Sequence, residues 1–245
     1  MFATSPSDRI DDYLRYVELV RGPDVLAKAE GASEEQIAKL RSVCPYPLPN
    51  LYIEWLRVFG RNEYGSGLDG DASYQIDSLT SAYETYGADD SMFPLNEELF
   101  STGVAFYYQS PGSWDHPVVV QTCEGMFDGV LAQSYQNFLY YNATLVVGRP
   151  KNVPMNRVSL RSPDSRLTPQ VSEILHELGY SGYWFNDSYR VIFDCDGVNL
   201  ITLPSTTSTQ VTMISHDGQK LAELSRTLTA RLQLVDITAR KMGDG

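Results

Sequence analysis

The chain has 245 residues, which suffices for one large domain or two small ones. Its formal net charge of −12, from 19 basic and 31 acidic side chains, disfavours binding to nucleic acids or anionic membranes. No run reaches the ~18 apolar residues that predict a membrane span, and the start of the chain lacks a signal-peptide pattern. Together with three widely spaced cysteines, Cys44, Cys123 and Cys195, this composition predicts a cytoplasmic globular protein with free thiols.

Charge is distributed unevenly along the chain. Residues 1–148 carry 8 basic and 21 acidic side chains, whereas residues 149–245 carry 11 basic and 10 acidic ones. Residues 62–148, here called the base-free stretch, contain no lysine or arginine but hold 12 acids and nine of the 16 tyrosines. This stretch serves either solubility or the docking of a basic partner, because surfaces of one sign steer association.

Three helices are predicted in the first 60 residues. The first begins near Ser5 or Ser7. The second follows Ser33, whose spacing to Gln36 is that of a capping box. The third covers residues 48–60 and is the most strongly specified, because four large apolar residues recur at i, i+3, i+4 and i+7. These four are Tyr52, Trp55, Leu56 and Phe59.

The rest of the first half alternates between short elements. After a polar, glycine-rich loop at 62–73, the pattern predicts a strand at 74–79, a helix at 80–86 and strands at 103–109 and 117–122. A further helix is predicted after Ser134, which is a typical helix N-cap.

The composition changes at Arg149, where a connector rich in proline, serine and arginine is predicted at 149–166. We therefore expect two domains, 1–148 and 149–245. The second reads as a helix opened by Thr168-Pro169, three strands at 189–193, 198–203 and 210–215, and a final helix. Antiparallel strands between helices predict an α+β fold in both halves.

No motif for a cofactor or a metal ion stands out. Gly65-x-Gly67-x-x-Gly70 matches a dinucleotide-binding pattern, but a helix precedes it where a strand is required. Asp194-x-Asp196-Gly197 lacks the third ligand pair and the glutamate of a calcium loop, and Asp69 with Asp71 is a carboxylate pair of a kind that is a weak metal-site signal in a chain with so many acids. Both pairs are therefore interpreted as turn residues. We expect no cofactor and no metal site.

The histidines and cysteines give no catalytic pattern either. His116, His176 and His216 lie far apart, and His176 is predicted to form a surface ion pair with Glu173 or Glu177. The three thiols are expected to be buried and inert. A triad assembled only by folding stays open, but no hydrolase or metalloprotease signature is present, so we expect no enzyme.

The third predicted helix resembles the signature of the SUKH superfamily. The match is Leu48-Pro49-x-x-Tyr52-x-x-Trp55-Leu56, then Phe59-Gly60, with a helix before it and an Asn- and Gly-containing loop after it. Phe93-Pro94-Leu95, two central strands and the helix after Ser134 extend the resemblance over about residues 30–145. It departs at Arg61-Asn62, which lacks an immediate glycine, and at Cys44-Pro45-Tyr46-Pro47, which replaces a short turn.

This resemblance implies an α+β immunity protein that binds a bacterial toxin, often a nuclease, in the cytoplasm. An acidic, tyrosine-rich surface suits such a basic partner. The motif residues are expected to lie in the core and the partner to contact acids of the base-free stretch. The candidate partner-binding acids are Asp69, Asp71, Asp89, Asp90, Glu97 and Glu98. The alternative is a general intracellular interaction or regulatory module on the same fold, without a toxin partner.

Overall fold

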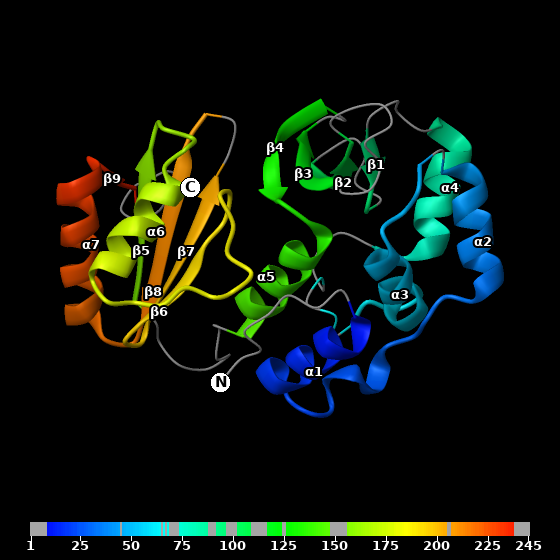
Figure 1. Cartoon of the computed structure of the whole chain (residues 1–245), viewed down its shortest axis with the longest axis horizontal. Coiled ribbons are helices and arrows are strands. Elements are labelled where there is room, and N and C mark those ends of the chain that lie inside the picture. Colours follow the sequence, from blue (N-terminus) through cyan, green and yellow to red (C-terminus); the bar gives the residue numbers. More distant parts are fainter. Residues whose placement is uncertain are drawn as a thin grey trace, which may run out of the picture. The chain divides into compact units, whose positions relative to one another are not determined.

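The computed structural model describes residues 9–44, 46–64, 66, 68, 74–87, 92–96, 102–108, 117–123, 126–147, 156–204 and 207–237. Over these residues the chain consists of helices and two antiparallel sheets, so the predicted α+β class is confirmed (Figure 1). The chain divides into two compact units, Met1–Arg149 (unit 1) and Pro150–Gly245 (unit 2). No helix in the described ranges is long and apolar enough to cross a membrane.

Most of the helices of the structure lie in unit 1. They are α1 (Ile10–Arg21), the 3-10 helix η1 (Val25–Lys28), α2 (Glu34–Val43), α3 (Asn50–Phe59), α4 (Ile76–Tyr86) and α5 (Tyr135–Val147). The capping box predicted at the start of α2 is present. The start predicted for α1 is wrong, because Arg9 is its N-cap. The strand predicted at 74–79 is also wrong, because Ile76 already begins α4, which buries Ile76 and Leu79.

The sheet of unit 1 has four antiparallel strands in sequence order. They are β1 (Met92–Pro94), β2 (Thr102–Tyr107), β3 (Val118–Cys123) and β4 (Met126–Ala132). The two inner strands were predicted, whereas the two outer ones were missed. β1 has only three residues, and β4 contains a glycine and an aspartate, so neither shows a clear apolar alternation.

The core of unit 1 is aromatic and lies between helices and one sheet face. The ring of Tyr52 on α3 makes edge contacts with Phe93 of β1, Phe106 of β2 and Tyr135 of α5, with centroids 6.2, 5.3 and 5.3 Å apart. All four rings are at most 4% exposed. Tyr52 of α3, the third predicted helix, therefore contacts each of the other three rings of this core.

Unit 2 has a five-stranded sheet. Its elements are β5 (Asn156–Ser162), α6 (Thr168–Glu177), β6 (Ile192–Cys195), β7 (Val198–Pro204), β8 (Thr209–Ser215), α7 (Gly218–Leu232) and β9 (Val235–Asp236), and the strand order is β6-β7-β8-β5-β9. The predicted β-hairpin at Asp196-Gly197 is confirmed. Both residues have positive φ, of 53° and 87°, as a type I′ turn requires.

The connector predicted at 149–166 is wrong in part, because β5 lies within it. This strand carries only two apolar residues, Val158 and Leu160, between polar ones. Its pairing with β8 over seven residues places Leu160 opposite Val211 and removes it fully from solvent. Long-range pairing thus makes a strand of a segment whose local composition is that of a loop.

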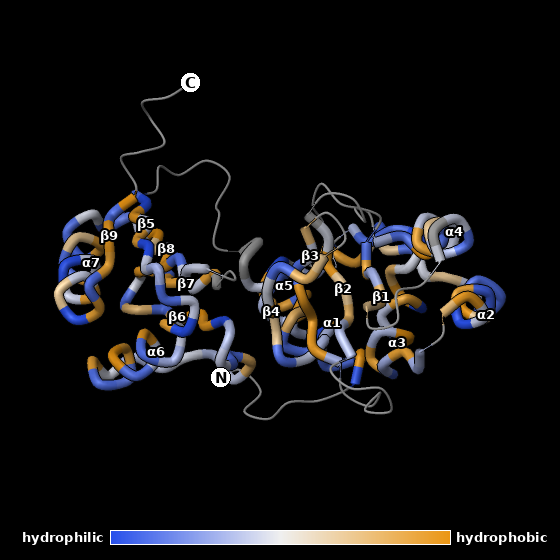
Figure 2. Tube along the Cα trace, turned by 90° about the horizontal axis from the view of Figure 1, so that it is seen from above, coloured by the Kyte–Doolittle hydropathy of each residue, from blue (hydrophilic) through white to orange (hydrophobic). Residues whose placement is uncertain are grey.

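Both helices of unit 2 pack on the same sheet face. Alternate strand residues such as Leu160, Leu200 and Met213 form one buried cluster with Leu175 of α6 and Leu224 of α7. Apolar and polar residues alternate along both helices in Figure 2, as expected for helices with one buried face. The unit therefore has a core made entirely of its own residues.

Candidate protein-binding surface

The acids predicted to bind a partner fall on parts of the chain that the structure does not place. Asp69, Asp71, Asp89, Asp90, Glu97 and Glu98 all lie outside the described residues. Four other acids of the base-free stretch are described. They are Glu63, Asp77, Glu84 and Asp128.

Three of these four acids are held by neighbouring side chains. Asp77, in the first turn of α4, accepts hydrogen bonds of 2.9 and 3.0 Å from Nε2 of Gln36. Glu84 forms an ion pair of 2.9 Å with Lys39, and Asp128 accepts a hydrogen bond of 3.0 Å from Gln121. The Lys39 ion pair neutralises Glu84, whereas the amide of Gln36 carries no charge and leaves the negative charge of Asp77 in place.

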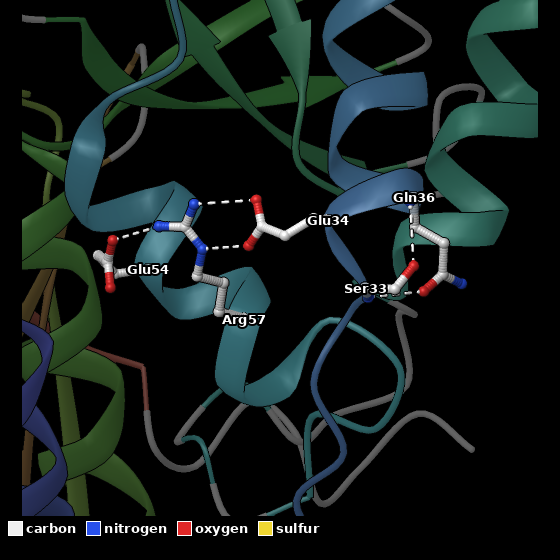
Figure 3. A network of polar contacts seen from close by, with 5 residues as sticks. All are labelled: Ser33, Glu34, Gln36, Glu54 and Arg57. Atoms are coloured by element: carbon white, nitrogen blue, oxygen red, sulfur yellow. Dashed lines mark hydrogen bonds and ion pairs between the residues drawn. The ribbon is translucent and has the colours of Figure 1, made fainter.

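The basic side chains of unit 1 are largely neutralised by acids close to them. Figure 3 shows Arg57 on α3 between two carboxylates, with Nε and Nη2 donating to Glu34 at 2.7 and 3.1 Å and Nη1 donating to Glu54. These hydrogen bonds hold the pKa of Glu34 below its ordinary value. Four further basic residues of the unit form ion pairs with acids. The pairs are Arg9–Asp11, Arg15–Asp12, Lys39–Glu84 and Arg61–Glu30.

Ion pairs offset much of the positive charge of unit 1. Five of its eight basic side chains are paired with acids in the described ranges, and none of the eight lies in the base-free stretch. Exposed ion pairs stabilise the fold little, but they cancel positive charge locally. The excess of acids is thereby left to the segment between Arg61 and Arg149.

The expectation of a tyrosine-rich surface is wrong for most of the tyrosines in this stretch. Of the eight whose burial is described, six are at most 9% exposed, and they serve the core of unit 1. These six are Tyr74, Tyr83, Tyr108, Tyr135, Tyr140 and Tyr141. Of the other two, Tyr107 is half-buried and Tyr64 is 48% exposed, with its ring under Nζ of Lys28, 4.9 Å from the centroid.

Two exposed apolar residues were missed by the sequence reasoning. Met126 is 66% exposed and Phe127 is 45% exposed, and both begin β4, which pairs only with β3 among the described strands. The Phe127 ring lies 5.4 Å from that of Tyr107, so it is held against the sheet. Methionine and phenylalanine are enriched in protein interfaces. Their signal in the sequence is an apolar pair between Glu124 and Asp128.

The residues of the family motif lie in the interior. Tyr52, Trp55 and Leu56 are at most 1% exposed, while Leu48 and Pro49 precede α3 and are half-buried. Burial is the main cause of the raised pKa of Tyr52. Tyr52, Trp55 and Leu56 are therefore core residues, and these three contribute to the fold rather than to a contact surface.

The remaining candidate metal- or cofactor-binding residues were Asp194 in its turn, the glycines of the loop after α3, and His116. Asp194 accepts a hydrogen bond of 3.0 Å from the backbone N–H of Gly197, which is the turn role expected for it. No group of three or more metal-ligating side chains occurs among the placed residues. The glycines Gly65, Gly67 and Gly70, and His116, lie outside the described residues.

Two expectations about titratable side chains are wrong. Nδ1 of His176 lies 3.1 Å from the carbonyl oxygen of Tyr180, and Glu177 pairs with Arg231, so neither forms the predicted ion pair. Cys44 and Cys195 are buried as expected, but Cys123, the last residue of β3, is exposed.

Comparison with known proteins returned no matching family model, no matching curated protein and no matching solved structure.

Proposed function

We propose that the chain is an immunity-type protein of the SUKH superfamily that binds and occludes a basic bacterial toxin, possessing no catalytic activity of its own. The observation that carries this proposal is the segregation of charge in unit 1. The base-free stretch has 12 acids and no base, and most basic side chains elsewhere in the unit are paired with acids. The motif around α3 supports the family assignment.

A nuclease toxin has a chemical requirement that a protein inhibitor can exploit. A nuclease needs lysine and arginine side chains to hold phosphate, so its active surface is positive. An acidic surface competes for those side chains, and electrostatic steering raises the association rate by about 10–10³-fold. Fast association matters because neutralisation must precede damage to the cell.

An apolar anchor at the sheet edge supplies what charge alone does not. Charge mainly accelerates the encounter, whereas buried aromatic contacts slow dissociation. Met126 and Phe127 are exposed apolar side chains between the acids Glu124 and Asp128 of the base-free stretch. They are the proposed anchors of the complex.

The test uses the toxin encoded beside the gene, co-expressed in a bacterium with and without the chain. Growth should be restored by the chain, and the association rate of the purified proteins should fall as salt is raised. Asp89→Lys combined with Asp90→Lys should slow association at least about tenfold at low salt. The matched control is Glu18→Lys with Glu35→Lys, the same charge change at exposed acids outside the stretch.

The anchor is tested separately by dissociation. Phe127→Ala should raise the dissociation rate at least about tenfold, as expected for an interface hot spot. Leu19→Ala is the control, because Leu19 is 67% exposed on α1 and outside the stretch. Failure of the chain to bind or rescue any neighbouring toxin would instead favour a general interaction module.

A further inference from the structure

Unit 2 contains a small pocket beside α7. It lies between one side of α7, the residues that follow α6 and the hairpin that joins β6 to β7, and its volume is about 230 Å³. Six of its lining residues determine its chemistry. They are Leu178, Cys195, Val198, Lys220, Glu223 and Leu224. Because sites for drug-sized ligands enclose about 300–1,000 Å³, this pocket suits a smaller molecule, of roughly the size of one amino acid.

The buried part of the lining is apolar. Cys195, Val198 and Leu224 are 2, 1 and 6% exposed, and a buried free cysteine behaves as a small apolar side chain. Leu178 directly follows α6 and is 42% exposed beside them. An apolar group placed in the pocket therefore shields Leu178 from water, and burial of apolar surface favours its binding.

The backbone around the pocket is fixed by the fold of unit 2. Gly179, with a φ of 87°, turns the chain at the end of α6, and the N–H of Tyr180 donates to the carbonyl oxygen of Leu175 at 3.0 Å. In the hairpin, Oγ of Ser215 donates to the carbonyl oxygen of Gly197 at 2.8 Å. The pocket is thus organised before any ligand arrives, which lowers the entropic cost of binding.

The exposed part of the lining carries charges of both signs. Lys220 and Glu223 lie three residues apart on α7, which places their Cβ atoms about 5–6 Å apart, close enough for an ion pair. Nζ of Lys220 instead donates to the carbonyl oxygen of Asp196 at 3.0 Å. Within the described ranges the Glu223 carboxylate has no hydrogen-bond or ion-pair partner. Lys220 therefore keeps two N–H donors for a ligand, and Glu223 keeps both carboxylate oxygens.

This combination matches a free apolar amino acid. Its carboxylate and ammonium groups are bonded to one carbon atom, so they suit a cation and an anion on neighbouring positions of one helix. Asp196, the second acid of the lining, adds to the attraction for the ammonium group. We propose that the pocket binds an amino acid with a side chain of the size of leucine, its carboxylate on Lys220, its ammonium on Glu223 and its side chain against the apolar lining.

The charges decide against a side chain that is presented within a partner's polypeptide. Such a residue carries neither an ammonium nor a carboxylate group, so it would fill the apolar part and leave Lys220 and Glu223 without a ligand group. The proposal concerns unit 2 and does not depend on the function proposed for unit 1, because the ligand follows from the pocket's own residues.

The probe is L-leucine, titrated into the ¹⁵N-labelled full chain and followed by amide chemical shifts. Three reference compounds each lack one feature: leucinamide the carboxylate, 4-methylpentanoate the ammonium group, and glycine the side chain. We expect saturable shifts at Tyr180, Asp196 and Glu223 with leucine, at a Kd below about 1 mM. Each reference compound should bind at least about tenfold more weakly, because one of the charged or apolar contacts is lost.

Two variants assign the contacts. Lys220→Gln should weaken leucine binding at least about tenfold and remove the preference for leucine over leucinamide, because the carboxylate loses its partner. Glu223→Gln should in the same way remove the preference for leucine over 4-methylpentanoate. Both residues are exposed, so both variants are expected to fold, and a dispersed spectrum checks this. The matched controls Arg226→Gln and Glu173→Gln, at exposed positions outside the pocket, should leave binding unchanged.

Three results would overturn the proposal. One is the absence of a saturable shift around the pocket. Another is equal affinity of the native chain for leucine and for either leucinamide or 4-methylpentanoate, which would show that an apolar group alone is recognised. The last is unchanged leucine binding by folded Lys220→Gln or Glu223→Gln. None of these results would affect the proposed toxin-binding surface, whose tests use the toxin.

Discussion

Individual residues of the aromatic core differ in how well their polar atoms are satisfied. The hydroxyl of Tyr52 and the indole N–H of Trp55 are buried without a hydrogen-bond partner in the described structure. Tyr108 in contrast donates to the carbonyl oxygen of Pro47 at 3.1 Å. An unpartnered buried hydroxyl weakens a fold, whereas a partnered one stabilises it.

This contrast predicts opposite outcomes for two identical substitutions. Tyr52→Phe should leave the free energy of unfolding unchanged or raise it, because the lost hydroxyl has no partner. Tyr108→Phe should lower it by about 1 kcal/mol, the usual contribution of one hydrogen bond. Urea unfolding of both variants measures the difference. Equal destabilisation by the two would show that the Tyr52 hydroxyl is hydrogen-bonded.

The three thiols should differ in reactivity. Burial raises the pKa of Cys44 to about 11 and that of Cys195 to about 12, whereas Cys123 is exposed. The thiolate is the reactive form. At pH 8 an aromatic disulfide reagent should therefore label one thiol in the native chain and three in denaturant. The variant Cys123→Ala should abolish native labelling, and persistent labelling would contradict the assignment.

The same shifts link stability to pH. A thiol whose folded pKa is raised stabilises the fold fully below the pKa of the unfolded thiol, about 8.5. The contribution is lost as the pH rises toward the folded values of about 11 and 12. Alkaline solution should thus lower the urea midpoint of the native chain.

At the scale of elements, the N-terminus of α2 is fixed by a capping box and by a hydrogen bond to α4. Oγ of Ser33 accepts from the N–H of Gln36 at 3.2 Å, and Oε1 of Gln36 accepts from the N–H of Ser33 at 2.9 Å (Figure 3). Gln36 also donates to Asp77 at the start of α4. A local cap therefore also aligns two helices that are distant in sequence.

Removing the cap should destabilise the chain measurably. Ser33→Ala should lower the free energy of unfolding by about 1 kcal/mol, because an N–H of the first turn loses its acceptor. Ser81→Ala, at an exposed position inside α4, is the control and should have no destabilising effect. Chemical denaturation compares the two. A Ser33→Ala variant as stable as the control would mean that water replaces the cap.

The whole molecule consists of two units, each with its own sheet. Every described strand pairs within its unit, and the buried cluster of unit 2 draws only on residues between Leu160 and Leu234. A chain segment with its own core is expected to fold alone.

Residues 150–245, expressed as a separate fragment, should fold on their own. The fragment should show helix and strand by circular dichroism and unfold cooperatively in urea, because its core needs no residue of unit 1. The variant Leu224→Ala within the fragment should lower stability by about 2–5 kcal/mol, since Leu224 is buried between α7 and the sheet. Gradual, non-cooperative unfolding of the unmodified fragment would contradict an independent core.

The sequence alone determined the features that depend on local patterns of residues. The capping box at Ser33, the apolar face of α3, the Asp196-Gly197 hairpin and the α+β class each depend on residues a few positions apart. The uneven charge is likewise a property of the order of residues. The tertiary structure decided what depends on distant pairing: that most tyrosines of the base-free stretch are buried, that β5 is a strand, and that Met126 and Phe127 remain exposed.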